Sequence, residues 1–241
     1  MASKIILPNT SLCSIVRDEK MNPAGGIQRF VEAHVPFVEE AVIVDTGSLD
    51  GTREILEEMQ AKYSNLRIYD HYFKGFADAR NYSLSKVKTK YSLVLDADEL
   101  LCQENPQNDW EKINNYMQEN KDFKFLEFDI EDVSLKRKIF ASNSSDYWKM
   151  RLFQPSQTEL EGALWENHIN FEKFHVDKIK GVSIKHFLPK LKGIVSKQNY
   201  WYKERYEHLF IEEIVKNGIA PSQIAGFIDW KKYNPKRDLY Y

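Results

Sequence analysis

Apolar runs alternate with helical stripes along the first hundred residues of the chain. Four apolar runs have the length of buried strands: 12–16, 41–44, 66–73 and 91–95. Three segments between them repeat apolar side chains at helical spacing: 27–34, 52–63 and 76–87. Because strands that alternate with helices form right-handed crossovers, the pattern predicts an α/β fold with a mostly parallel central sheet.

After residue 100 the pattern changes. One helix is expected at 110–120, with Trp110, Ile113, Tyr116 and Met117 on its inner face. Short strands are expected at 123–130, 136–141, 147–154 and 182–187, the first two as an antiparallel pair. From residue 194 onward the pattern is helical. We therefore expect one α/β domain at 1–190, in two halves (1–100 and 101–190), followed by a helical extension at 191–241.

Composition and charge exclude several classes of protein. The 241 residues hold 34 Lys and Arg against 36 Asp and Glu, and a net charge of -2 argues against a nucleic-acid-binding domain. A hydrophobic fraction of 42% is enough for a full core. No apolar run approaches the ~18 residues that span a bilayer, and no signal-peptide core is visible. Two cysteines, Cys13 and Cys102, are too few for a disulfide framework and favour a reducing, cytoplasmic compartment.

Three polar clusters follow directly on predicted strands, at 17–19, 45–48 and 96–98. The carboxyl ends of parallel strands meet at one edge of a sheet, where ligands bind. Asp96 and Asp98, at i and i+2 after a strand, can both face a hard cation such as Mg²⁺ or Mn²⁺. Acids in this place also cap the next segment, and the turn after Asp45 would equally suit an ordinary strand-to-helix connection.

The ordered set of motifs resembles the GT-A fold, family 2 glycosyltransferases, in the branch that decorates lipopolysaccharide, capsule and bacterial glycoproteins. The segments that carry the resemblance are SIVRDE (14–19), VDTGS with DGT (44–52), GFADARN (75–81), LDADE (95–99) and RLF (151–153). LWE (164–166) and IKH (184–186) stand at two later motifs of the branch. The resemblance covers roughly 10–210 and implies a Rossmann-like sheet with an antiparallel extension on the acceptor side.

The resemblance also implies roles for individual residues. Those assigned to the donor, a nucleotide-diphosphate sugar that is a UDP-sugar by family habit, are Arg17, Asp18, Glu19, Asp45, Lys74, Arg80 and Asp96. Those assigned to Mn²⁺ or Mg²⁺ are Asp98, Asp96 and His186. An interior structural role is the alternative for His186. Asp45 with Arg17 and Asp18 would contact base and ribose, whereas Lys74 and Arg80 would offset diphosphate charge.

Glu166 is the expected general base of an inverting transfer, because such a reaction needs a carboxylate that takes the acceptor proton. Trp165 stands where the branch usually has a histidine, so His168 is the alternative candidate for the base. The alternative role for Glu166 is that of a solvated acid in a loop. The expected acceptor is a hydroxyl of a glycan, glycoprotein or glycolipid. Two other functions stay open: a catalytically silent nucleotide-sugar or glycan-binding subunit, and a Mg²⁺-dependent nucleotidyltransferase.

The C-terminal extension combines an apolar stripe with positive charge. Residues 190–238 hold ten Lys and Arg against six Asp and Glu, a local charge of +4. Tyr202, Tyr206, Leu209 and Phe210 follow helical spacing, and such a stripe must be covered. The stripe either packs on the main domain or forms an interface. Among the possible interfaces, self-association is favoured over membrane contact, because a local charge of +4 is weak for lipid binding.

Overall fold

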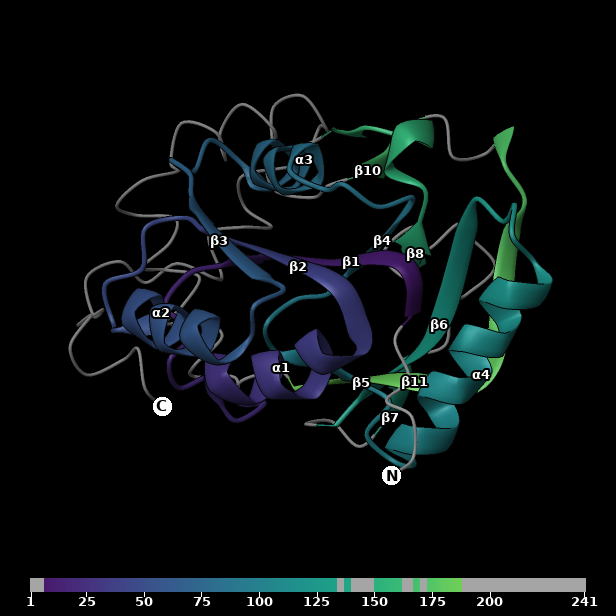
Figure 1. The fold of residues 1–241 in the computed structure, drawn as a ribbon, viewed down its shortest axis with the longest axis horizontal. Helices are drawn as coiled ribbons and strands as arrows, with labels where there is room; N and C mark the ends of the chain where they lie inside the picture. Colours follow the sequence, from purple (N-terminus) through teal and green to yellow (C-terminus); the bar gives the residue numbers. More distant parts are fainter. Residues whose placement is uncertain (1–6, 134–136, 140–149, 162–166, 170–172, 188–241) are drawn as a thin grey trace, which may run out of the picture.

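The computed structural model describes residues 7–133, 137–139, 150–161, 167–169 and 173–187 (Figure 1). The expected helical extension at 191–241 and the candidate base Glu166 lie outside these residues. The division of the chain at residue 190 therefore stays a prediction. Within the described part, no helix has both the length and the apolar character that crossing a bilayer requires.

Four parallel strands form the first half of the main sheet, in the order β3-β2-β1-β4. They are β1 (Leu7–Val16), β2 (Val38–Asp45), β3 (Leu66–Asp70) and β4 (Tyr91–Val94). Alternate side chains of β1 and β2 enter two separate core clusters, Leu12 and Ile43 in one and Cys13 and Val44 in the other. Burial on both faces explains why these strands are almost uninterrupted apolar runs.

Helices cover both faces of this sheet (Figure 1). They are α1 (Gly26–His34), α2 (Thr52–Lys62), α3 (Phe76–Ser85) and α4 (Pro106–Glu119), with a short 3₁₀ turn, η1 (Val35–Phe37), after α1. The core cluster of α1, α2 and α4 contains Leu56 and Trp110, whereas Tyr82 of α3 packs in the opposite cluster. The four predicted helices are confirmed. α4 begins four residues earlier than expected because Pro106 suits the first turn of a helix.

The second half of the sheet is mixed and continues in the order β4-β8-β6-β11-β5. The strands are β5 (Glu99–Leu101), β6 (Phe125–Asp132), β7 (Arg137–Ile139), β8 (Met150–Phe153) and β11 (Val176–His186). β8 runs antiparallel to β4 and β6, and β7 pairs antiparallel with β6 as predicted. β11 begins six residues before the predicted strand and lies parallel to β6, which the sequence did not indicate.

Two features of the second half were not predicted at all. β5 is a three-residue strand that pairs antiparallel with the end of β11. After β8 and the 3₁₀ turn η3 (Pro155–Gln157), a separate two-strand ribbon forms from β9 (Leu160–Glu161) and β10 (Asn167–His168). Strands of two or three residues are too short to leave a periodic signal in the sequence.

The strand register brings the polar clusters to one edge of the sheet. Val16, Asp45 and Asp70 end β1, β2 and β3 side by side, and Cys13 pairs with Val94 near the end of β4. β3 ends at Asp70, three residues short of the prediction, because the chain then leaves the sheet. The strand order reverses at β1, which lies between β2 and β4. A reversal of this kind is where α/β sheets bind ligands.

Candidate active site

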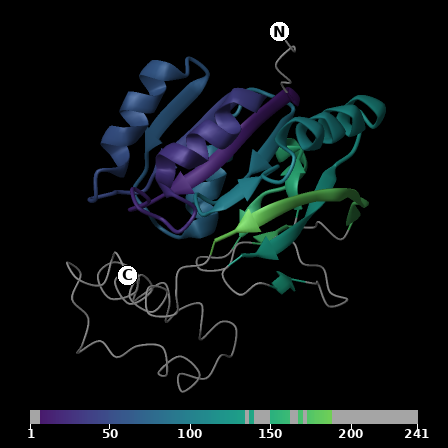
Figure 2. The ribbon, with the colours of Figure 1, turned by 90° about the horizontal axis from the view of Figure 1, so that it is seen from below.

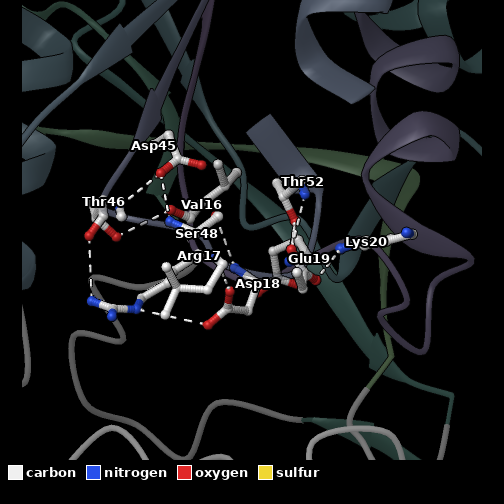
Figure 3. Close-up of polar contacts among 12 residues, drawn as sticks. Val16, Arg17, Asp18, Glu19, Lys20, Asp45, Thr46, Ser48 and Thr52 are labelled. Atoms are coloured by element: carbon white, nitrogen blue, oxygen red, sulfur yellow. Dashed lines mark hydrogen bonds and ion pairs between the residues drawn. The ribbon is translucent and has the colours of Figure 1, made fainter. Parts of the chain in front are cut away.

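The loops that follow β1 and β2 lie against each other (Figure 3). The backbone N–H of Asp18 donates to Ser48 Oγ at 3.0 Å, and the Asp18 carboxylate accepts the N–H of Leu49 at 2.7 Å. Asp18 has a φ of 53°, a left-handed conformation that the second loop holds in place. Two further bonds join the loops, from Glu19 N–H to Thr52 Oγ1 at 2.7 Å and from Lys20 N–H to Asp50 Oδ2 at 2.9 Å.

Asn22 ties the same loop to the Asp-Ala-Asp segment. Its side-chain oxygen accepts the N–H groups of Ala24 and Gly26 at 3.0 Å, and its Nδ2 donates to the carbonyl of Ala97 at 2.8 Å. Gly26 has a φ of +86°, and a Cβ there would lie 2.3 Å from the Lys20 carbonyl oxygen. Only glycine fits this close approach. Asn22 was not among the predicted site residues; its signal in the sequence is an asparagine at the start of a Pro-Gly turn.

One carboxylate oxygen of Asp45 bonds to the protein, and the other has no partner among the described residues. Its Oδ1 accepts the N–H groups of Gly47 and Ser48 at 2.7 and 2.8 Å, which shapes the turn after β2. Its Oδ2 is buried and has no hydrogen-bond partner among the described residues. A buried acceptor in this state is costly, so a ligand N–H or hydroxyl would be bound favourably there.

Arg17 and Glu19, two other donor-site candidates, lie in the loop that packs against the loop after β2. Arg17 is buried, with Nη1 3.3 Å from the carbonyl of Thr46 and Nε 3.9 Å from Asp18 Oδ2. Glu19 is also buried, and its carbonyl accepts the N–H of Ile27 at the start of α1. Lys74 is exposed in the loop that leads into α3. The structure thus brings Arg17, Asp18, Glu19 and Asp45 together around two neighbouring strand ends.

The Asp-Ala-Asp segment forms a turn that Glu99 closes. The Glu99 N–H donates to the Asp96 carbonyl at 2.9 Å, and the Glu99 carboxylate accepts the Asp96 N–H at 3.0 Å. The Glu99 side chain also pairs with Arg151 Nη2 at 2.5 Å. Because Arg151 lies on β8, this ion pair joins the turn to the second half of the sheet. Arg151 belongs to the RLF motif, but the sequence indicated no role for it.

Two arginines flank the Asp96 carboxylate. Arg80, from α3, donates to Oδ1, and Arg151 Nη2 lies 3.8 Å from Oδ2. Partial burial raises the pKa of Asp96, but the charges of Arg80 and Arg151 outweigh it and hold that pKa well below its usual range. The pKa of Glu99 is raised because its carboxyl is buried, with Arg151 opposing and Asp96 reinforcing the shift. Asp96 therefore stays charged at neutral pH.

Asp98 and His186 meet beside this turn. His186 is the last residue of β11 and pairs with Glu99 of β5, which places its Nε2 3.9 Å from Asp98 Oδ2. The His186 Nδ1 is buried without a hydrogen-bond partner among the described residues. The next residue, Phe187, donates its N–H to the Asp98 carbonyl at 2.9 Å. The structure thus brings together two of the residues that the resemblance assigns to the metal.

The donor atoms of Asp98 and His186 fit a cation that also binds phosphate. Carboxylate oxygen and imidazole nitrogen both suit Mn²⁺, and a phosphate-bound cation needs only one or two protein ligands. Within the described ranges, no group of three or more His, Cys, Asp or Glu side chains is placed to hold a metal on its own. The two residues therefore fit a shared site with a substrate, and their metal role stays a prediction.

His168, the alternative base, lies in an aromatic environment. Its ring packs edge-to-face on Phe125 and Phe153, with centroid distances of 5.2 and 4.6 Å, and its Nδ1 is 3.3 Å from Thr158 Oγ1. Burial first, and then the charge of Arg151, lower the pKa of His168 to about 4. This environment indicates a packing role for His168, and a catalytic role stays a prediction. Glu166, two residues earlier, lies outside the described residues.

Comparisons with solved structures agree on the fold. S. aureus TarS 1–349 in complex with UDP-GlcNAc superposes with a TM-score of 0.61 at 14% identity, over 75% of this chain and 59% of that one. The mannosyltransferase PcManGT from Pyrobaculum calidifontis, in complex with GDP-Man and Mn²⁺, gives 0.54 at 14% identity, over 91% of this chain and 68% of that one. The predicted GT-A fold is confirmed.

Sequence comparisons identify the family. A TPR repeat-containing protein of Synechococcus elongatus is 36% identical over 98 residues, which are 41% of this chain. The chain spans 22% of that relative and 59% of the TarS fragment. The model of the family described as glycosyl transferase family 2 matches residues 27–178, more than half of the chain. The chain therefore belongs to glycosyl transferase family 2.

Proposed function

We propose that this chain transfers a sugar from a nucleotide-diphosphate sugar to a hydroxyl group of a glycan, glycoprotein or glycolipid, with inversion at the anomeric carbon. One observation carries the proposal. Asp45, whose Oδ2 has no partner among the described residues, the Asp98–His186 pair and the arginine-flanked Asp96 lie around one strand-order reversal of the sheet. A hydrogen-bond acceptor for a base or ribose thus stands near groups that suit a diphosphate.

The donor class is supported by the structural neighbours. TarS holds UDP-GlcNAc and PcManGT holds GDP-Man with Mn²⁺, so two nucleotide bases occur on this fold. For this chain we favour a UDP-sugar. Asp45 Oδ2 would accept from the base or ribose, with Arg17 and Asp18 beside it, and Lys74 and Arg80 would attract the diphosphate.

The reaction then depends on charge at the leaving group and on a base at the acceptor. Asp98 and His186 would hold Mn²⁺ or Mg²⁺, which when bound offsets the negative charge of the departing diphosphate. Asp96 pairs with Arg80 and Arg151 and would hold them beside that charge. Glu166 would take the proton of the acceptor hydroxyl as its oxygen attacks the anomeric carbon.

A thermal-shift panel tests the donor class. The panel holds UDP, GDP, UDP-GlcNAc and GDP-mannose, each with and without Mn²⁺, and ADP-ribose serves as a control for unspecific binding. A ligand that binds the native state adds about 2.7 kcal/mol of stability at a hundredfold excess over its Kd. We expect a Mn²⁺-dependent shift with at least one nucleotide sugar. No shift with any of the four compounds would contradict the proposal.

Two substitutions separate the candidates for the base. Glu166→Gln keeps the size of the side chain but cannot take a proton, so transfer should fall about 100-fold while donor affinity holds. His168→Phe keeps a ring against Phe125 and Phe153 and removes the titratable group. We expect this variant to retain transfer. A full rate in Glu166→Gln with an inactive His168→Phe would move the role to the histidine.

A further inference from the structure

The side-chain amide of Asn81 binds Leu160 of the β9–β10 ribbon through both backbone polar groups of Leu160. Asn81 Nδ2 donates to the Leu160 carbonyl at 2.7 Å, and the Leu160 N–H donates to Asn81 Oδ1 at 3.0 Å. Leu160 is buried and lies 79 positions further along the chain. The side-chain amide of Asn81 thus provides one hydrogen-bond donor and one acceptor, as a neighbouring strand would. Both backbone polar groups of Leu160 are satisfied by it.

The ribbon depends on such contacts because it is short. Glu161 pairs with Asn167 and Leu160 with His168, and the two strands form a sheet of their own. A two-strand ribbon is marginal in water unless other elements hold it. Besides Asn81, the ring of His168 anchors the ribbon by packing against Phe125 and Phe153.

The helix that carries Asn81 also carries Arg80. Consecutive residues of a helix point about 100° apart, so α3 can serve two neighbours at once. Arg80 donates to Asp96 in the Asp-Ala-Asp turn, and Asn81 binds Leu160 of β9. α3 itself packs on β1 and β2, the strands that lead into the donor site. One rigid helix therefore joins the donor side to the ribbon.

We propose that Asn81 is a positioning residue that sets the place of the β9–β10 ribbon relative to the donor site. The two strands of the ribbon flank residue 166 in the sequence, so Asn81 acts on acceptor activation and not on donor binding. This inference rests on the proposed function, in which Glu166 is the base. It adds a link between the two halves of the site, through adjacent residues of α3.

Asn65 offers a matched control at the other end of the sheet. Its Nδ2 donates to the carbonyls of Val35 and Val38, both at 3.0 Å, so it is also an amide that holds backbone. It precedes β3 and contacts the start of β2, whereas the candidate site lies at the carboxyl ends of these strands. Asn65→Ala should therefore weaken the fold without affecting the ribbon.

Hydrogen exchange tests the structural part without any ligand. In Asn81→Ala we expect the peptide 158–169 to exchange at least tenfold faster than in the unmodified protein, and Asn65→Ala to leave that peptide unchanged. Asn81→Asp keeps the acceptor but loses the donor, and should behave like Asn81→Ala. An exchange rate in Asn81→Ala equal to that of the unmodified protein would overturn the proposal.

Kinetics test the functional part, with nucleotide release from UDP-GlcNAc and from GDP-mannose measured separately in the presence of Mn²⁺. Asn81→Ala should lower kcat at least tenfold with the Kd of UDP or GDP within twofold of the unmodified value, whereas Asn65→Ala keeps both. The double variant with Glu166→Gln should be no slower than Glu166→Gln alone, because the two residues act as a unit. Losses that multiply would overturn the role of Asn81. A full rate in Glu166→Gln alone would instead refute the proposed base.

Discussion

Replacement of Arg151 by methionine should destabilise the fold strongly, because it leaves the buried carboxylate of Glu99 without its positive partner. Arg151 Nη2 lies 2.5 Å from the carboxylate of Glu99, and the Glu99 side chain is only 2% exposed. Removal of one partner from a buried ion pair costs about 3 to 5 kcal/mol. The second contact of Arg151 adds little, because Asp96 is 37% exposed and keeps Arg80.

The expected loss is large enough for a routine measurement. A domain of this size loses about 2 to 4 °C of Tm for each kcal/mol, so Arg151→Met should melt roughly 6 to 20 °C lower. Equilibrium unfolding in urea, followed by circular dichroism at pH 8, gives the free energy directly. Arg53→Met is the control, because Arg53 pairs with Asp70 and Glu57 at the surface and its loss should cost less than about 1 kcal/mol.

A second substitution identifies the cause. Glu99→Gln removes the charge but keeps an oxygen that can accept the Asp96 N–H, so the turn stays closed. The double variant Arg151→Met/Glu99→Gln should therefore recover most of the stability lost in Arg151→Met. An Arg151→Met variant as stable as the unmodified protein, or a double variant no more stable than the single one, would refute this reasoning.

Three further predictions follow from the structure, and a fourth follows from the sequence of the C-terminal extension. Burial lowers the pKa of His34 to about 4, so the protein takes up a proton on unfolding below pH 6.5. The free energy of unfolding should therefore fall by up to about 3 kcal/mol between pH 6.5 and 4. His34→Gln should flatten this part of the pH profile measured by urea unfolding. Asp98→Asn should keep the Tm and lose Mn²⁺-dependent nucleotide release, and a native rate in excess chelator would contradict the metal role. Asp45→Asn should weaken UDP or GDP binding about tenfold by calorimetry, with little change in Tm. Deletion of residues 219–241 should leave a folded, nucleotide-binding protein that loses its oligomeric state in light scattering, whereas monomers in both forms would contradict it.

The tautomer of His34 shows how the tertiary structure decides a property that the sequence leaves open. Nε2 accepts the N–H of Leu101 at 3.0 Å, so the proton must lie on Nδ1, which donates to the Phe30 carbonyl at 2.8 Å. The sequence placed His34 at the end of a helix and no more. Its neutral, buried state depends on β5, a strand that periodicity did not indicate.

The parts that the sequence determined are those with a local physical signal. Strands buried on both faces are apolar runs, amphipathic helices repeat at 3.6 residues, and polar residues at strand ends gather at one edge of a parallel sheet. For this reason β1 to β4 and the four helices were predicted correctly, and so was the meeting of the polar residues Arg17, Asp18 and Asp45 at one edge of the sheet. Figure 2 shows the parallel strands side by side with the mixed half of the sheet beyond them.

Only the tertiary structure decided which distant segments meet. The antiparallel pairing of β11 with β5 brings His186 to Asp98, β8 brings Arg151 to Glu99, and α3 brings Asn81 to Leu160. No periodicity within a window of residues encodes such pairings. These pairings arise because the sheet must bury its apolar faces and satisfy its backbone hydrogen-bonding groups at the same time. Segments far apart in the chain must combine to meet both conditions.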